Sequence, residues 1–218
     1  MLSVVIPVLN GGRELGACLA SVAGAEEVVV VDGGSSDDSV AIAQATGASV
    51  IAAPRGRGAQ LHAGAEAARG DWLLFLHADT RLSADWHAAA AAHIAAAPGK
   101  TGYFALRLDD AAWQARVIER GVAARSRLLG LPYGDQGLLV SRRLYGEVGG
   151  FRALELMEDV DLARRIGRQL LRPLAATALT SAERWRRDGW LNRSTRNLGC
   201  LALYGVGVSP ARLARLYR

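Results

Sequence analysis

The hydrophobic positions of the first 80 residues form short continuous runs, separated by turn residues and by stretches with a helical spacing. Continuous apolar runs of this length are typical of strands that are buried on both faces of a parallel sheet. The stretches between them place apolar residues three and four positions apart, as an amphipathic helix does. Strands are therefore predicted at residues 2–9, 27–32, 49–53 and 72–80, with a helix after each.

The pattern becomes less regular in the second half of the chain. Helices are predicted at residues 83–97, 111–129 and 157–168, strands at 101–108 and 138–141, and an apolar helix at 198–216. Strands that alternate with helices of about a dozen residues favour βαβ units with right-handed crossovers. The expected fold class is therefore α/β with a largely parallel sheet, in one domain that spans residues 1–218.

The charge of the chain is unusual because 25 arginines accompany a single lysine, Lys100, and give a formal net charge of +5. With heavy use of alanine and glycine, this bias indicates genome base composition, and no nucleic-acid partner is predicted. The alternative is an anionic partner, either a phosphate-bearing ligand or an acidic membrane surface. The two cysteines, Cys18 and Cys200, provide neither a disulfide framework nor a zinc site.

A cytoplasmic protein is expected. The first residues lack the basic leader and the cleavage site of a signal peptide. The apolar stretch at 198–208 is well short of the roughly 20 residues that span a bilayer.

Carboxylates stand at the ends of two predicted strands. Asp32 ends the second strand and Asp79 ends the fourth, so both are expected at the same edge of the sheet, where ligands bind in open α/β folds. Asp79 is predicted to bind a metal. For Asp32 a turn-forming role before Gly33 and Gly34 is an equal alternative. The first turn, residues 10–16, lacks the glycine spacing of a dinucleotide-binding loop, and the chain has no Walker loop.

Four ordered motifs resemble family-two glycosyltransferases of the GT-A fold. They are Val4-Val-Ile-Pro-Val-Leu-Asn10, Val28-Val-Val-Val-Asp-Gly-Gly-Ser-Ser-Asp37, Arg69-Gly-Asp-Trp-Leu-Leu-Phe-Leu-His-Ala-Asp79 and Met157-Glu-Asp-Val-Asp-Leu162. The resemblance covers residues 2–190 and implies a mixed, mostly parallel sheet flanked by helices. It is strongest to short bacterial members with His-Ala-Asp, Gly-Asp-Gln and Arg-Trp segments, which are associated with arsenosugar-type biosynthesis.

The resemblance implies a nucleoside-diphosphate sugar, UDP-linked or GDP-linked, as donor, with Asp32 reading the base. In the family the second acid of an Asp-x-Asp motif binds a divalent cation; here Asp79 matches it and His77 replaces the first acid. An imidazole suits Mn²⁺ better than Mg²⁺, so this departure leaves the metal open. Residues expected at the donor are Pro7, Asn10, Asp32, Arg57, His77, Ala78, Arg184 and Arg186. A solvated basic patch is the alternative for the two arginines near 185.

The Glu158-Asp159 pair resembles the acidic motif of the family. The resemblance implies that Asp159 is the general base of an inverting displacement and that Glu158 orients the acceptor or a basic group. The alternative is an acidic first turn that complements the helix dipole. Asp135 and Gln136 lie between glycines and are predicted to line the acceptor pocket.

The predicted enzyme has a nucleotide-binding half at 1–98, an acceptor and catalytic half at 99–190 and a helical tail at 191–218. Its acceptor is expected to be a small molecule or lipid-linked. The tail is expected to pack on its own domain, to form a homodimer or to make a peripheral contact with the inner face of the membrane. Two other functions remain: a nucleotidyltransferase that acts on a sugar phosphate, and a non-catalytic membrane-associated binding protein.

Overall fold

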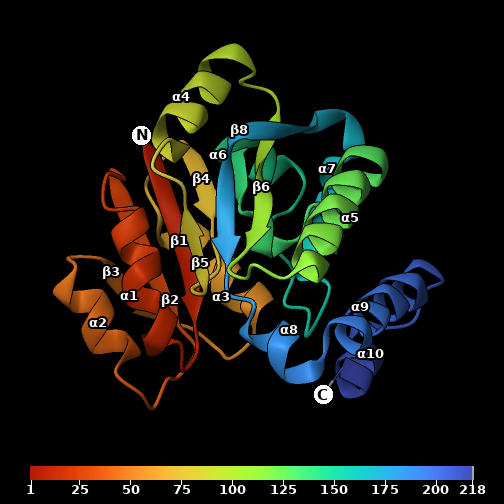
Figure 1. Cartoon of the computed structure of the whole chain (residues 1–218). Coiled ribbons are helices and arrows are strands. Elements are labelled where there is room, and N and C mark those ends of the chain that lie inside the picture. The colour runs from red at the N-terminus through yellow and green to blue at the C-terminus, as the bar shows by residue number, and fades with distance from the viewer. Residues whose placement is uncertain (218) are drawn as a thin grey trace.

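The computed structural model describes residues 1–217, which form one eight-stranded sheet with helices on both faces (Figure 1). The strands are β1 Leu2–Val8, β2 Glu27–Asp32, β3 Ser49–Ala52, β4 Trp72–Phe75, β5 Thr80–Leu82, β6 Thr101–Leu108, β7 Leu138–Ser141 and β8 Leu171–Thr180. The α-helices are α1 Gly12–Ser21, α2 Ser39–Ala45, α3 Arg57–Ala67, α4 Trp86–Ala96, α5 Trp113–Leu129, α6 Arg142–Glu147, α7 Glu158–Ile166, α8 Glu183–Asp188, α9 Trp190–Gly205 and α10 Pro210–Tyr217. Two short 3₁₀ helices are η1 Gly134–Gln136 and η2 Arg168–Leu170.

The strand order is β3-β2-β1-β4-β7-β6-β8-β5. The pairs β1 with β2, β1 with β4 and β2 with β3 are parallel, as the alternation of strands and helices predicts. Antiparallel pairing of β4 with β7 joins the two predicted halves of the chain into one continuous sheet. The expected single α/β domain with a mixed, mostly parallel sheet is thereby confirmed.

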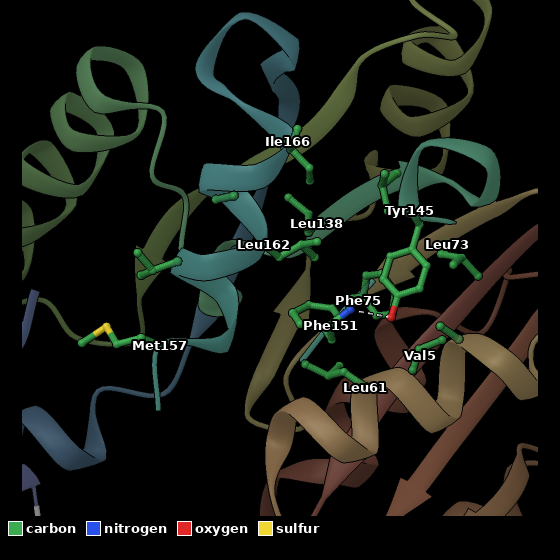
Figure 2. Close-up of a cluster of buried hydrophobic side chains, with 14 of the residues drawn as sticks. Val5, Leu61, Leu73, Phe75, Leu138, Tyr145, Phe151, Met157, Leu162 and Ile166 are labelled. Carbon is green, nitrogen blue, oxygen red and sulfur yellow. Dashed lines mark hydrogen bonds between the residues drawn. The ribbon is translucent and has the colours of Figure 1, made fainter. Parts of the chain in front are cut away.

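The two faces of the sheet bury different side chains because neighbouring strand residues point in opposite directions. Val4 and Ile6 pack with α1, α2 and α4 on one face. Val5, Leu73 and Phe75 pack with α3, α6 and α7 on the other, together with residues of α9 and α10. Figure 2 shows this second cluster, in which the Tyr145 hydroxyl accepts a 2.9 Å hydrogen bond from the backbone N–H of Phe151.

The apolar run at residues 72–80 is not one strand, contrary to the sequence prediction. β4 ends at Phe75, and a turn closed by the Thr80 N–H and the His77 carbonyl separates it from β5. β5 then pairs antiparallel with β8. Periodicity does not locate this break, because the apolar run continues past Phe75 to Leu76 before the polar residues begin.

Strand β8 has no counterpart among the predicted elements. Its sequence is rich in alanine, which has low strand propensity, and contains Pro173. The proline is tolerated because β5 covers β8 only at Ala178–Thr180, so the outer edge at Pro173 needs no donor. Residues 171–180 thus form a strand through tertiary pairing with β6.

The predicted tail helix at 198–216 is wrong as a single element. Helix α9 begins earlier, at Trp190, and ends at Gly205, and α10 begins at Pro210. Gly207, with φ +91°, and Pro210 explain the break, because the first adopts a left-handed backbone and the second cannot continue a helix. Among residues 1–217, no helix combines the length and hydrophobicity needed to cross a bilayer.

Candidate active site

Two hollows lie side by side at the carboxyl ends of β1 and β4. A cleft of about 660 Å³ includes residues from β1, α1, α3 and the turn after β4. A smaller cavity of about 120 Å³ lies toward α7, α8, α9 and α10. The two hollows share the residues Arg57, His77, Asp79, Leu156, Ser181, Arg184 and Tyr217. Most of the predicted chemistry is therefore on one continuous surface.

Asp79 and Arg184 meet because β5 pairs with β8. The Asp79 carbonyl accepts a 3.1 Å hydrogen bond from the Ser181 N–H, just after the Thr80–Thr180 pair of the ladder. Helix α8 starts two residues later, so Arg184 stands in its first turn and lines both hollows. A carboxylate and a guanidinium from distant parts of the chain thus border the same space.

Gly134 connects His77 with Asp159. Its backbone N–H donates a 2.8 Å hydrogen bond to Oδ2 of Asp159. A Cβ atom at this position would lie 2.4 Å from Nε2 of His77, a separation that real Cβ atoms do not adopt. Burial, together with the positive charge of Arg57, lowers the pKa of His77 to about 4, so the imidazole is neutral at neutral pH. It therefore retains a lone pair for a hydrogen-bond donor or a cation.

Glu158 and Arg57 form an ion pair between the first residues of α7 and α3. Nε of Arg57 lies 2.8 Å from Oε1 of Glu158, whose side chain is only 1% exposed. Burial raises the pKa of Glu158, and the Arg57 charge opposes the rise. Gly56 has φ +138°, which glycine adopts without strain, and it delivers Arg57 to the helix start. Of the two orienting roles predicted for Glu158, the pairing favours the one directed at a basic group, and that role stays a prediction.

Met157 precedes the pair in a left-handed backbone conformation, with φ +66°. Such a φ is uncommon for a residue without a short polar side chain, and it is found where the surroundings enforce it. The buried Met157 side chain packs in the core cluster of Figure 2. The strained residue thus fixes the direction in which α7 presents Glu158 and Asp159.

Asp135 borders the small cavity with a carboxyl group that is poorly satisfied. Burial raises its pKa to about 6, with further contributions from the charges of Asp159 and Asp79, while Arg125 acts in the opposite direction. Its Oδ1 atom is buried and has no hydrogen-bond partner in the described part of the chain. The same holds for Oδ1 of Asn197 on α9, which lines the same cavity. The cavity therefore offers two acceptor atoms to a hydrogen-bond donor.

Pro7, Asn10 and Ala78, which the sequence predicts at the donor, line the large cleft. Asn10 has φ +51°, a conformation that asparagine tolerates. Its side-chain oxygen accepts a 2.8 Å hydrogen bond from the N–H of Ser36, which ties the loop after β1 to the loop after β2.

Four predicted residues do not line these two hollows, and one of them is Glu158, which is buried against Arg57. Asp32 is 9% exposed and its carboxylate accepts hydrogen bonds from the N–H groups of Gly34 and Ser35, which is the turn-forming alternative. Arg186 pairs with Asp110 at 2.9 Å and lines a different hollow.

The acceptor contact predicted for Gln136 is also corrected. Its side chain is 1% exposed, accepts a 2.8 Å hydrogen bond from the Ser126 hydroxyl and donates to the Phe104 carbonyl. It holds η1 onto β6 and α5. Of the Asp135-Gln136 pair, only Asp135 lines the cavity.

Sequence reasoning missed the aromatic and carboxyl-terminal side chains of the cavity. They are Tyr133, Trp185, Arg193, Asn197 and Tyr217. Trp185 was part of the Arg-Trp resemblance, but nothing in the sequence distinguishes the others from packing or surface residues. Arg193, Asn197 and Tyr217 reach the cavity because α9 packs against α8 and α10 packs against α9.

The residues present fit a divalent cation that is shared with a phosphate ligand. No group of three or more His, Cys, Asp or Glu side chains within residues 1–217 is arranged to hold a metal. Asp79 and the neutral His77 border both hollows and provide two ligands at most. Mg²⁺ and similar ions are commonly bound by one or two carboxylates, with phosphate oxygens and water completing the shell.

Comparison with known sequences finds a match in the first half of the chain. Residues 3–107 are similar to glycosyl transferase family 2. Over 106 residues the chain is 40% identical to the PGL/p-HBAD biosynthesis glycosyltransferase of Mycobacterium tuberculosis. That match covers 43% of this chain and 41% of the relative, so the chain spans well under half the length of this protein.

Solved structures extend the likeness beyond this segment. A mannosyltransferase from Pyrobaculum calidifontis, in complex with GDP-Man and Mn²⁺, superposes with a TM-score of 0.71 and 16% identity, covering 99% of this chain and 67% of that protein. Glucosyl-3-phosphoglycerate synthase from Mycobacterium tuberculosis, in complex with Mn²⁺ and UDP-Glc, gives a TM-score of 0.59 and 20% identity, covering 83% and 69%. At these identities the comparison shows the fold, which is that of GT-A glycosyltransferases.

Proposed function

We propose that this protein is a metal-dependent, inverting glycosyltransferase that moves a sugar from a nucleoside-diphosphate sugar to a small or lipid-linked acceptor. The observation that carries the proposal is the position of Asp159. Its carboxylate, held by the Gly134 N–H, borders the same cavity as Asp79, His77 and Arg184. A base and a phosphate-binding surface are thus within one hollow.

The large cleft is the proposed donor site. Its volume of about 660 Å³ is within the usual range for ligands of nucleotide size. Arg57 and Arg184 border it, and guanidinium groups bind phosphate oxygens in a fork. Asp79 and His77 would hold a Mn²⁺ or Mg²⁺ ion, which supplies charge neutralisation of the leaving diphosphate when bound. The choice between UDP and GDP stays a prediction.

Asp159 is the proposed general base. One of its oxygens accepts the Gly134 hydrogen bond, which fixes the carboxylate. We propose that it removes the proton of the acceptor hydroxyl while the acceptor oxygen bonds to the anomeric carbon and the bond to the diphosphate breaks. The configuration of that carbon inverts, because the attack is a single displacement. Such proton transfer is typically worth about 10² to 10⁴ in rate.

The small cavity is the proposed acceptor site. Asp135 and Asn197 present unsatisfied acceptor atoms, and Tyr133 and Trp185 provide aromatic surface. Hydroxyl groups of an acceptor would satisfy both atoms. An anionic group close to Asp135 and Asp159 would be repelled by like charge. These properties favour a neutral, hydroxyl-bearing acceptor end group.

The test separates donor binding from transfer. Calorimetry with UDP and GDP, with and without Mn²⁺, should show metal-dependent binding of one of them, and a panel of their sugars should give release of that nucleoside diphosphate. An Asp159→Asn variant should keep nucleotide affinity and lose about 10² to 10⁴ in turnover. Asp71→Asn, at a side chain that is 85% exposed, is the matched control and should keep full turnover. Unchanged turnover in Asp159→Asn would remove Asp159 as the base.

The two alternative functions predict other products. A nucleotidyltransferase would release pyrophosphate from a nucleoside triphosphate and a sugar phosphate. A non-catalytic binding protein would bind a nucleotide or membrane and turn over none of the panel. The match of residues 3–107 to glycosyl transferase family 2 favours sugar transfer over both.

The narrower assignments extend the same proposal. Membership of the His-Ala-Asp subgroup with arsenosugar-type biosynthesis is testable by including such acceptors in the panel. For the carboxyl-terminal helices we propose an external contact, either a peripheral contact with the cytoplasmic face of a membrane or a homodimer.

A further inference from the structure

Helix α9 exposes a long face that carries no charge. The residues of α9 that are exposed are Leu191, Asn192, Thr195, Leu198, Gly199, Ala202, Leu203 and Gly205, and Val206 follows them. Leu191, Leu198 and Val206 are 74%, 62% and 80% exposed. Solvent-facing helix surfaces of soluble proteins normally carry charged side chains. We call these residues the α9 face.

The arginines of α9 point away from this face. Arg193 is 7% exposed, and Arg193 and Arg196 both bind Asp188 at the end of α8, at 2.8 and 2.6 Å. Arg193 also donates a 3.0 Å hydrogen bond to the Tyr217 hydroxyl of α10. These contacts fix the rotation of α9, so its apolar side is held outward.

The helices around the α9 face are strongly basic. Residues 183–217 contain seven arginines against Glu183 and Asp188, a formal charge of +5 that equals the charge of the whole chain. Arg187, Arg212 and Arg215 are exposed. Helices α9 and α10 lie together at one end of the molecule, with α8 beside them (Figure 1). An uncharged apolar face is thus carried by the most cationic part of the protein.

We infer that the α9 face docks on a lipid bilayer that contains anionic headgroups. Apolar side chains of an interfacial helix enter the boundary of the acyl region, and neighbouring arginines are attracted to the negative surface. A second copy of the chain fits less well. A twofold interface brings the same surface together from both subunits, so two identical segments of charge +5 would repel each other. The anionic membrane complements that charge.

Docking in this way brings the small cavity close to the headgroups. The inward side of α9 provides Arg193 and Asn197 to the cavity, while the outward side is the α9 face. The two sides are separated by the width of one helix, about 10 Å. If the proposed transferase function holds, this position selects a lipid-linked acceptor over a freely diffusing one. The docking itself does not depend on that function.

The experiment is flotation of the whole chain with vesicles. Vesicles of phosphatidylcholine alone are compared with vesicles that also contain phosphatidylglycerol, at low and high salt. The wild-type chain should float with the anionic vesicles, and high salt should weaken this binding. A Leu191→Ser/Leu198→Ser variant should bind them at least about tenfold more weakly, because it removes two apolar anchors. Both positions are exposed, so circular dichroism and UDP or GDP binding should be unchanged.

A matched control is available on α5. Leu128 is 63% exposed, as Leu198 is 62% exposed, but it lies outside the α9 face, and Leu128→Ser should keep full vesicle binding. The inference is overturned if the wild-type chain floats with neither kind of vesicle. It is overturned as well if Leu128→Ser weakens vesicle binding as much as the double variant does. It is also overturned if sedimentation shows a dimer that the double variant loses. Because nucleotide binding is measured in the same samples, failure of docking is distinguishable from failure of the proposed function.

Discussion

The buried carboxyl of Asp135 is expected to destabilise the folded protein at neutral pH. Burial raises its pKa from 3.8 to about 6, so the folded protein holds this proton over a pH range where the unfolded chain has lost it. The stabilisation is complete below pH 3.8 and is lost as the pH rises through about 6. Ionisation in the folded state therefore costs about 3 kcal/mol relative to the unfolded chain, or about 1 to 3 kcal/mol once screening in the cavity is allowed for.

An Asp135→Asn variant cannot ionise and should escape this cost. We expect it to be more stable than the parent by about 1 to 3 kcal/mol above pH 6, and equal to it near pH 4. The same variant should raise the acceptor KM, because the carboxylate is the proposed acceptor contact. Substitution of a functional residue often raises the stability of the protein while it lowers the activity.

Urea denaturation at about pH 4.5 and about pH 7.5, without divalent cations or nucleotide, measures the difference. Asp71→Asn, at an exposed carboxylate, is the control and should show no comparable dependence on pH. If Asp135→Asn is no more stable than the parent at the higher pH, or if its gain is the same at both pH values, the carboxyl is not held at an energetic cost and the reasoning fails.

Two further substitutions test the scaffold of the site. Gly134→Ala should cut turnover at least about tenfold, because its Cβ would lie 2.4 Å from Nε2 of His77. Its control is Gly121→Ala on α5, which has open space around it and should keep activity while gaining about 0.5 to 1 kcal/mol in stability. Kinetic assays and urea midpoints check both variants, and equal activities would contradict the packing around Gly134. Tyr145→Phe should lower the free energy of unfolding by about 1 to 3 kcal/mol, since it leaves the buried N–H of Phe151 without its partner. Thermal denaturation measures this loss, and an unchanged melting temperature would show that the N–H finds another acceptor.

The sequence by itself determined the parallel core of the fold. Runs such as Val28–Val31 are apolar at every position, so they require burial on both faces, and the helices between them require right-handed crossovers. Since parallel strands share an edge at their carboxyl ends, the place of Asp79 near the site followed as well. Pattern and motif together also selected His77, Asn10 and Asp159, which line the two hollows.

Only the tertiary structure decided how the second half completes the site. Strand β8 exists because β6 and β5 pair with it, and that pairing brings Ser181 and Arg184 to Asp79. Asp32 and Gln136 carry side chains that often bind ligands. However, the amides of a turn bind the Asp32 carboxylate, and the Gln136 side chain is buried in the core. Local sequence shows which groups a residue offers. Which groups meet in the site depends on more distant segments, as when Thr80 pairs with Thr180 and Gly134 binds Asp159.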